Sequence, residues 1–386
     1  MAHPKLVFSN TYGHPNVGDE AIVTAMVQEL RHHLGDVQIS FLSSWPKLSR
    51  QNHPDLNVIE SKSFIGVKAT TKAIREADLL IVGGGGIIQD ATSLGNLLFH
   101  LSRMVIAHIT KTPFMAYAIG VGPLTSKVSR SVTKSILSKA EIITVRDQAS
   151  ADLLHKIGFP LNQVQVTADP VMNLNFNSDA MRYPIMQKVR EQKRKGHPLI
   201  TISLRPVIDQ YRILPKSSTT FSISEQLVET MANVVQQLIN LYDANILFCS
   251  MHPKQDDQIG EHLAAKVDIA SRMTFIPVLP PSVMLSVLGQ ADMCLGMRLH
   301  SLIMASRSNV PLVALSYDPK VEGFMTLLGQ QSGIVRPIDW NYETILKTTS
   351  NIWTYREEIS EQISKRVPQL QVKASRNAQI VANIIR

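Results

Sequence analysis

The chain has 386 residues, a length that suits two domains with separate hydrophobic cores. Hydrophobic residues make up 44% of it and charged residues 18%, yet no apolar run reaches the ~20 residues of a membrane-spanning helix. The net charge of +8 favours acidic partners, either phosphorylated substrates or an anionic membrane surface, while the 6% aromatic content is too low for the stacking platforms of a nucleic-acid-binding protein.

In the first half of the chain, short β-branched runs alternate with longer amphipathic runs, which is typical of βαβ units around a parallel sheet. The first amphipathic run predicts a helix over Glu20–His33, with Ile22, Met26 and Leu30 on one face. The alternation breaks at Asp169-Pro170. The predicted strands are Lys5–Ser9, Gln38–Leu42, Leu79–Val82, Phe114–Ile119, Ile142–Val145 and Val164–Thr167.

The same alternation returns after a basic segment, Lys188–Lys195, and includes a helix predicted over Ser224–Leu241. The last stretch, Glu357–Arg386, has a helical pattern, and we expect it to return to the first domain. The predicted strands of this second set are Leu199–Ser203, Asn245–Ser250, Thr274–Pro277, Met293–Leu295 and Leu312–Leu315.

Two such sets predict an α/β fold made of two Rossmann-like βαβ domains that face a cleft at the carboxyl ends of their strands. The expected divisions are an N-terminal domain at 1–175, a basic linker at 176–197, a C-terminal domain at 198–356 and C-terminal helices at 357–386.

Cys249 and Cys294 each lie inside an apolar run and lack the spacing of metal ligands. The N-terminus shows no signal-peptide core. We therefore expect a cytoplasmic protein with reduced cysteines and no metal site.

Glycines and charged residues follow the predicted strands of the first domain. Asp19 comes just before the predicted helix, where it would cap the first-turn amides, act as a base at the mouth of the cleft, or do both. A run of four glycines that includes Gly84 and Gly85 would form either an anion nest or a tight strand-to-helix turn. Arg146 would either face the cleft or pair with Asp147 at the surface.

Cations and histidines follow the strands of the second domain. Arg205 precedes a proline that stops its strand, and a guanidinium held there suits a carboxylate or phosphate. His252 is a loop histidine with either a substrate role or none. Arg298 and His300 lie two residues apart where an apolar strand gives way to a helix, which makes an anion site with a proton donor. Lys320 follows the next strand, and packing does not readily explain such groups at consecutive strand ends.

Together these segments resemble the polysaccharide pyruvyltransferases, most closely the bacterial cell-wall members that modify the polymer anchoring surface-layer proteins. Each glycine segment alone is weak evidence, but the ordered set extends through almost the whole chain. His14-Pro15 departs from the small or aromatic residues that relatives usually carry in that loop. The matching segments are Tyr12-Gly13, Asn16–Ala21, Gly83–Asp90, Gly120–Pro123, Val145–Asp147, Asp169-Pro170, Gly296–His300 and Tyr317–Lys320.

The resemblance implies a fold like that of the two-domain glycosyltransferases of the B type, with the acceptor on the first domain and the donor on the second. It implies transfer of pyruvate from phosphoenolpyruvate to two hydroxyls of a sugar as a cyclic ketal. For the cell-wall subgroup, the acceptor is N-acetylmannosamine in a disaccharide on a polyprenyl diphosphate. The family pattern makes Arg205, Arg298, His300 and Lys320 donor-binding residues, with Arg146 as a further member.

Phosphoenolpyruvate carries about three negative charges near neutral pH, so its binding requires a cluster of arginine and lysine. We expect His300 to protonate the methylene carbon or to assist the departure of phosphate, and Asp19 to deprotonate the acceptor hydroxyl. Gly84, Gly85 and His252 are further expected substrate contacts. The sequence shows no nucleotide fingerprint or metal cluster, so we expect no cofactor.

The basic segment Lys188–Lys195 is either a solvated helix face or a contact with an anionic membrane, which would place the protein at the inner face of the cell membrane beside a lipid-linked acceptor. Two other functions stay open. One is a sugar-nucleotide glycosyltransferase of the same architecture, for which Glu322 is the candidate ribose-binding carboxylate. The other is a non-catalytic binding protein of the same fold.

Overall fold

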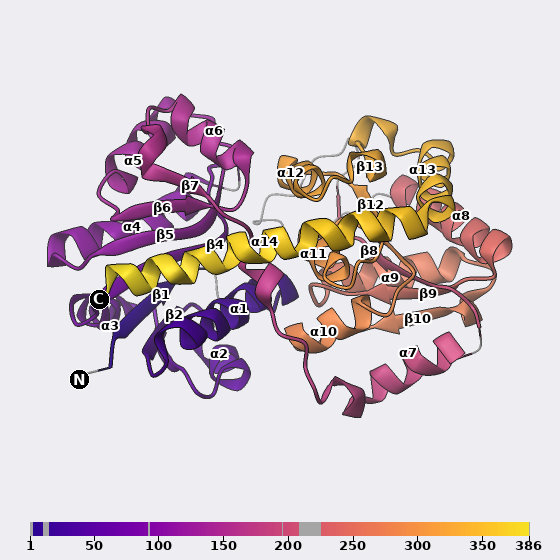
Figure 1. Ribbon diagram of the computed structural model, residues 1–386, viewed down its shortest axis with the longest axis horizontal. Coiled ribbons are helices and arrows are strands. Elements are labelled where there is room, and N and C mark those ends of the chain that lie inside the picture. The colour runs from indigo at the N-terminus through magenta and orange to yellow at the C-terminus, as the bar shows by residue number, and fades with distance from the viewer. Residues whose placement is uncertain (1–2, 11–14, 92, 195, 208–224, 386) are drawn as a thin grey trace. The chain divides into compact units, whose positions relative to one another are not determined.

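The computed structural model describes residues 3–10, 15–91, 93–194, 196–207 and 225–385. The chain forms two compact units, each built around one parallel sheet (Figure 1). The first unit comprises Met1–Pro15, Asp19–Asn175 and Leu370–Arg386, and the second comprises Asn16–Gly18 and Phe176–Gln369. Tyr12, Gly13, His14, Lys195 and Ser224, which belong to predicted motifs or elements, lie outside the described residues.

The sheet of the first unit is entirely parallel. Its strands are β1 (Lys5–Ser9), β2 (Gln38–Ser43), β3 (Asn57–Glu60), β4 (Leu79–Ile88), β5 (Phe114–Val121), β6 (Ile142–Val145) and β7 (Val164–Val166). They lie in the order β3-β2-β1-β4-β5-β6-β7, so the strand order reverses direction between β1 and β4. The predicted strands agree with β1 and β6 to the residue. The sequence analysis missed β3, because its four residues are flanked by polar ends and resemble a loop.

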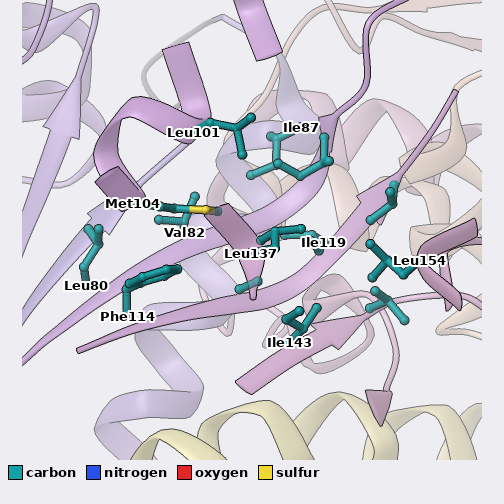
Figure 2. Packing of buried hydrophobic residues seen from close by; sticks show 14 of the residues in the cluster. Leu80, Val82, Ile87, Leu101, Met104, Phe114, Ile119, Leu137, Ile143 and Leu154 are labelled. Carbon is teal, nitrogen blue, oxygen red and sulfur yellow. The ribbon is translucent and has the colours of Figure 1, made fainter. Parts of the chain in front are cut away.

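One face of this sheet is covered by a continuous hydrophobic core, shown in Figure 2. Leu80 and Val82 of β4 and Ile143 of β6 contribute to it from the sheet, while Leu101 and Met104 contribute from a helix above. Period-2 alternation along the strands directs these side chains to one face. The helices of the unit are α1 (Val17–Leu34), α2 (Pro46–Asn52), α3 (Phe64–Arg75), α4 (Leu94–Thr110), α5 (Lys127–Leu137) and α6 (Gln148–Lys156), together with the short helices η1 (Leu161–Gln163) and η2 (Pro170–Asn173).

The four glycines lie inside β4, which is longer than predicted and pairs with β5 through an irregular register between Gly85 and Ile88. Gly84 has a φ of +70°, and a Cβ atom there would lie 2.2 Å from Cγ2 of Ile22 in α1. The glycines therefore allow α1 to approach the strand closely, and their backbone conformation is one that other residues rarely adopt.

The second unit repeats the arrangement with six parallel strands. They are β8 (Leu199–Ser203), β9 (Asn245–Cys249), β10 (Met273–Ile276), β11 (Met293–Gly296), β12 (Leu312–Leu315) and β13 (Ile334–Val335). Their order is β10-β9-β8-β11-β12-β13, with the reversal between β8 and β11. The two-residue β13 is the strand that the sequence pattern missed here.

The helices of the second unit include the segment that we had expected to be a linker. Residues 176–197 group with this unit, and most of the basic segment lies in α7, where Met186 and Val189 are buried. The helices are α7 (Pro184–Arg194), α8 (Glu225–Tyr242), α9 (Gln255–Lys266), α10 (Pro281–Leu288), α11 (Leu299–Ser306), α12 (Pro319–Leu327), α13 (Tyr342–Thr354) and α14 (Arg356–Ile384), with the short helices η3 (Ala180–Arg182), η4 (Ala270–Arg272), η5 (Gln331–Gly333) and η6 (Pro337–Asp339).

The long C-terminal helix α14 contributes to both units, because its residues from Leu370 onward group with the first. Asn377 in that part accepts hydrogen bonds from the hydroxyls of Thr144 and Thr167, at 2.6 and 3.0 Å. We expected the whole of 357–386 to return to the first unit. Only the part from Leu370 onward groups with it. Within the described ranges, no helix has both the length and the apolar character needed to cross a bilayer.

Candidate active site

The candidate site lies at the carboxyl ends of the strands in the second unit. Arg205 follows the end of β8 by two residues, and Arg298 follows the end of β11 by two residues. These two strands flank the point at which the strand order reverses, where connections leave in opposite directions and open a crevice. The backbone N–H of Met297 donates to the carbonyl of Ser203 over 2.7 Å, which ties the two strand ends together.

Arg298 is held by a buried carboxylate. Its Nε and Nη2 atoms donate to Asp256 Oδ2 and Oδ1 over 3.1 and 2.5 Å, and Asp256 is fully buried near the start of α9. Asp256 also accepts a hydrogen bond from the backbone N–H of Met251, at 3.0 Å. A two-pronged pair of this kind fixes the plane of the guanidinium. Arg298 is therefore already paired with an anion inside the protein, which the sequence analysis did not anticipate.

Tyr317 lies between two of the predicted donor-binding cations. The guanidinium carbon of Arg205 lies 4.5 Å from the centre of the Tyr317 ring, and Lys320 Nζ lies 5.2 Å from it. Lys320 is also 3.0 Å from the carboxylate of Asp318, whose other oxygen caps the first turn of α12. Arg205 Nε is buried and has no hydrogen-bond partner among the residues that the structure describes. The structure thus brings Arg205 and Lys320 together around one aromatic ring.

The electrostatics of this cluster act on the phenol. Burial raises the pKa of Tyr317, but the nearby cations of Lys320, Arg205 and Arg298 outweigh burial and the opposing Asp318 carboxylate. The net effect lowers the pKa of Tyr317 from 10.0 to about 8. Cations stabilise the phenolate relative to the phenol, so the direction of this pKa shift agrees with a net positive charge around the ring.

Two histidines complete the predicted set in this unit. His300 is the second residue of α11 and is half-buried. His252 follows β9 and is half-buried, with Nδ1 2.7 Å from the carbonyl of Pro253. Burial and then the Arg298 cation lower the pKa of His252 below 6.5. His252 therefore lies close to Arg298, while the catalytic role of His300 stays a prediction.

Arg146 has a different environment from the one expected. It belongs to the first unit, is only 5% exposed, and donates from Nη1 to Asp169 Oδ2 over 3.0 Å. A Cβ atom on Gly120 would lie 3.0 Å from Arg146 Nη2, so the guanidinium is closely packed. Asp147, the partner considered in the sequence analysis, lies 3.7 Å from Arg146 Nε and also caps α6 by accepting from the backbone of Ser150. Arg146 is thus buried and paired within the first unit, and its contact with the donor stays a prediction.

Gly84 and Gly85, the predicted substrate contacts of the first unit, lie inside β4, and a role in substrate binding stays a prediction. Both are buried, and the carbonyls of Gly83 and Gly84 accept hydrogen bonds from the side-chain amide of Asn10. A Cβ atom on Gly85 would lie 3.3 Å from that amide. These glycines accommodate α1 and Asn10, and their burial leaves no open anion nest at this position.

Asp19 is the third residue of α1 and does not precede the helix as predicted. The helix begins at Val17, and the side chain of Asn16 accepts the hydrogen bond from the backbone of Gly18 over 2.9 Å. Asn16 thus performs the capping that was one of the roles considered for Asp19. Asp19 groups with the first unit, and its role as a base stays a prediction.

The sequence analysis missed two residues of this cluster, Tyr317 and Asp256. Tyr317 belongs to one of the segments that resemble the family, Tyr317–Lys320. Its position after a strand and three residues before a lysine could have indicated its place in the cluster. Asp256 gave no such signal, because an acidic residue in the first turn of a helix is common.

Carboxylates elsewhere bear on the alternative functions. Glu322, the candidate ribose-binding residue, accepts from Arg336 Nε and Nη2 over 3.2 and 2.8 Å, so it is engaged within the protein. Across the described part of the chain, no three His, Cys, Asp or Glu side chains gather in a way that could hold a metal ion.

Comparison with known proteins identifies the family. Residues 16–319 match the sequence profile of the polysaccharide pyruvyl transferases. The chain belongs to this family. As such it is a transferase of polysaccharide biosynthesis. It is 21% identical to the amylovoran biosynthesis protein AmsJ of Erwinia amylovora over 428 aligned positions, which cover 99% of this chain and 98% of that protein.

Solved structures establish the fold of this pyruvyl transferase. A UDP-N-acetylglucosamine 2-epimerase homologue from Listeria monocytogenes aligns with a TM-score of 0.65 at 12% identity, over 97% of this chain and 95% of its own. A glycosyltransferase from Rickettsia africae aligns with a TM-score of 0.64 at 12% identity, over 100% and 99%. Both likenesses concern the fold alone. They confirm two Rossmann-like domains of the glycosyltransferase B type.

Proposed function

We propose that this transferase moves pyruvate from phosphoenolpyruvate to two hydroxyls of a sugar, forms a cyclic ketal and releases phosphate. The proposed acceptor is N-acetylmannosamine in a disaccharide on a polyprenyl diphosphate, as in the cell-wall members that the sequence resembles. One observation carries the donor assignment: Arg205 and Lys320 both lie against the ring of Tyr317, 4.5 and 5.2 Å from its centre. A substrate with about three negative charges is complementary to a cluster of positively charged side chains.

In this scheme, Arg205 and Lys320 bind the carboxylate and phosphate of the donor, and Arg298 completes the site in the orientation that Asp256 imposes. A rigid guanidinium loses little freedom on binding, so prior pairing with Asp256 favours recognition of a fixed geometry. The cations also stabilise the negative charge that develops on the departing phosphate.

In this reaction each proton that leaves one group is accepted by another. His300 gives a proton to the methylene carbon, which makes C2 electrophilic, and one sugar hydroxyl adds to C2 while Asp19 takes its proton. The bond from C2 to the phosphate oxygen then breaks. The second hydroxyl adds to C2, and the two protons released by the hydroxyls reach His300 and the phosphate. The products are the ketal and inorganic phosphate, and no oxidant or reductant is required.

The rival function, a sugar-nucleotide glycosyltransferase, requires a carboxylate for the ribose, and Glu322 is bound to Arg336. A binding protein without activity requires no histidine near the cations. These points favour pyruvyl transfer from phosphoenolpyruvate over both.

The test is release of phosphate from phosphoenolpyruvate by the purified protein, with and without a lipid-diphosphate mimic that carries N-acetylmannosaminyl-N-acetylglucosamine. Acceptor-dependent release, with a product heavier by one pyruvyl ketal, would support the proposal. Binding of the donor without release on any sugar would favour the binding protein. No binding of the donor would overturn the assignment and favour a sugar nucleotide.

A lipid-linked acceptor also suggests contact with the inner face of the membrane, and the basic segment Lys188–Lys195 is one candidate surface. Lys193 donates to the carbonyl of Gln290 over 2.9 Å, and the structure does not describe the side chain of Arg194 or any of Lys195. Neutralising Lys193, Arg194 and Lys195 should weaken vesicle binding if this segment is the contact, and unchanged binding would exclude it.

A further inference from the structure

The outward face of α4 in the first unit is apolar along its length. Leu94, Leu98, Val105 and Ile109 are 44%, 44%, 37% and 72% exposed. At about 100° per residue, these four positions fall within roughly 60° of arc on the helix. They form one stripe, which we call the α4 stripe. The adjoining face of the helix, with Leu101 and Met104, is buried in the core of the unit (Figure 2).

The helices on either side of α4 carry exposed cations. In α3, Lys68, Lys72 and Arg75 are exposed and fall within about 60° of arc, beside Ile65, which is 78% exposed. In α5, the exposed cations are Lys127, Arg130 and Lys134. Both helices pack directly against α4, and all three bury residues in the same core.

None of the three helices contains an acidic residue in its sequence. The acidic residues nearest in the chain, Glu60, Glu76, Asp78, Asp90 and Glu141, precede or follow these helices, and Asp90 accepts hydrogen bonds from the backbone N–H groups of Thr125 and Ser126 just before α5. Near the start of α3, Lys62 Nζ lies 4.8 Å from the ring centre of Trp45, and both side chains are exposed. Exposed tryptophan and lysine side chains are common at the boundary between water and lipid.

We propose that α3, α4 and α5 form a surface that binds an anionic lipid bilayer, with the α4 stripe inserted among the acyl chains and the cations of α3 and α5 against the headgroups. Interfacial binding requires an apolar face flanked by lysine and arginine, and this surface has both. A protein partner would have to tolerate six cations around the stripe without a paired acid from these helices, whereas a bilayer rich in anionic lipid matches that charge. The surface does not depend on the proposed reaction, although a lipid-linked acceptor would give it a purpose.

The experiment is co-sedimentation of the full chain with vesicles of phosphatidylcholine alone or with phosphatidylglycerol, without substrate. Leu98→Ser/Ile109→Ser should lower partitioning into anionic vesicles by roughly tenfold, because two exposed apolar side chains no longer enter the lipid. Lys68→Gln/Lys72→Gln should lower it about fivefold for each cation removed, with a smaller effect at high salt.

Matched controls remove the same chemistry elsewhere. Leu241→Ser/Ile338→Ser removes two exposed apolar side chains of the second unit, and Lys266→Gln/Lys347→Gln removes two exposed cations of the same unit, in α9 and α13. Both controls should keep wild-type binding. All the substituted side chains are exposed, so circular dichroism melts should stay unchanged and would identify any variant that fails to fold.

Three outcomes would overturn the proposal. The wild type does not bind anionic vesicles, the controls lose as much vesicle binding as the α3 and α4 variants, or the α3 and α4 variants disrupt a dimer of this protein and leave vesicle binding unchanged. Turnover on a water-soluble acceptor mimic separates this result from the reaction itself. A variant that no longer binds vesicles should keep that turnover. Lost vesicle binding therefore tests the membrane surface, and lost turnover tests the proposed reaction.

Discussion

Arginines at strand ends have opposite environments in the two sheets. In the first, Arg146 is buried, paired with Asp169 and packed against glycines. In the second, Arg205 is half-buried over the ring of Tyr317, beside Lys320, in a cluster that shifts the titration of the phenol. A position at the carboxyl end of a strand therefore does not by itself determine whether an arginine is buried in an ion pair or lies in a cluster of cations. The groups packed against the guanidinium make that distinction.

The largest expected effect concerns the second unit. His300→Ala should lower turnover by about 10²–10⁴-fold, the usual contribution of a positioned acid or base, while donor binding stays partly intact. Single-turnover kinetics with phosphoenolpyruvate, combined with calorimetric donor binding, would separate the two. Arg298→Ala is the comparison, because it should weaken donor binding itself. Near-native turnover of His300→Ala would remove this residue from the mechanism.

Removal of Arg146 should affect stability more than binding. Arg146→Met should lower the free energy of unfolding by about 3–5 kcal/mol, because it leaves the carboxylate of Asp169 buried without its cation. Urea denaturation measures this. Arg205→Met is the matched control, and its cost should stay below about 1 kcal/mol since, among the residues that the structure describes, no acidic side chain loses an ion pair with it. If Arg146→Met folded with wild-type stability and lost donor binding, the predicted contact with the donor would be right after all.

A smaller effect is expected within the glycine run. Gly84→Ala should lower the free energy of unfolding by about 1–3 kcal/mol, because the residue has a φ of +70° and its new methyl group would meet Ile22. Gly86→Ala is the control. Gly86 is exposed, and the nearest atom to a Cβ there is 3.6 Å away. Equal effects of the two substitutions would show that packing against α1 is not what requires glycine.

The most subtle prediction is a pH dependence. Above the pKa of Tyr317, about 8, the phenolate competes with the donor for the cations of Arg205 and Lys320. The affinity for phosphoenolpyruvate should thus be constant below pH 8 and fall by about tenfold between pH 8 and pH 9.5. Tyr317→Phe should abolish this decline and keep the affinity measured at pH 7. The same decline in the phenylalanine variant would assign it to another group.

Much of the fold was predictable from the sequence, because alternating apolar runs determine which faces are buried. β1, β6, β8 and β12 agree with the prediction to the residue. β3 and β13 were missed because strands of four and two residues carry too little periodicity. The start of α1 was misplaced because two acidic residues in its first turn, Asp19 and Glu20, masked the capping role of Asn16.

The candidate site was only partly predictable. Arg205, Arg298 and Lys320 follow their strands as expected, since topology alone places strand ends at one edge. The pairs Arg298–Asp256 and Arg146–Asp169 join residues 42 and 23 positions apart, and local pattern carries no information about such contacts. The two pairs fix the orientation of each guanidinium and its remaining capacity to bind an anion. Only the structure reveals them.

The passage of α14 into the first unit has a consequence for biosynthesis. Asn377, which accepts hydrogen bonds from Thr144 and Thr167, leaves the ribosome only after the whole of the second unit has been made. Until then the first unit lacks the segment from Leu370 onward, although its sheet is already complete. The N-terminal unit, translated first, is therefore the last to reach its final form, and a nascent chain should be most exposed to misfolding at β6 and β7.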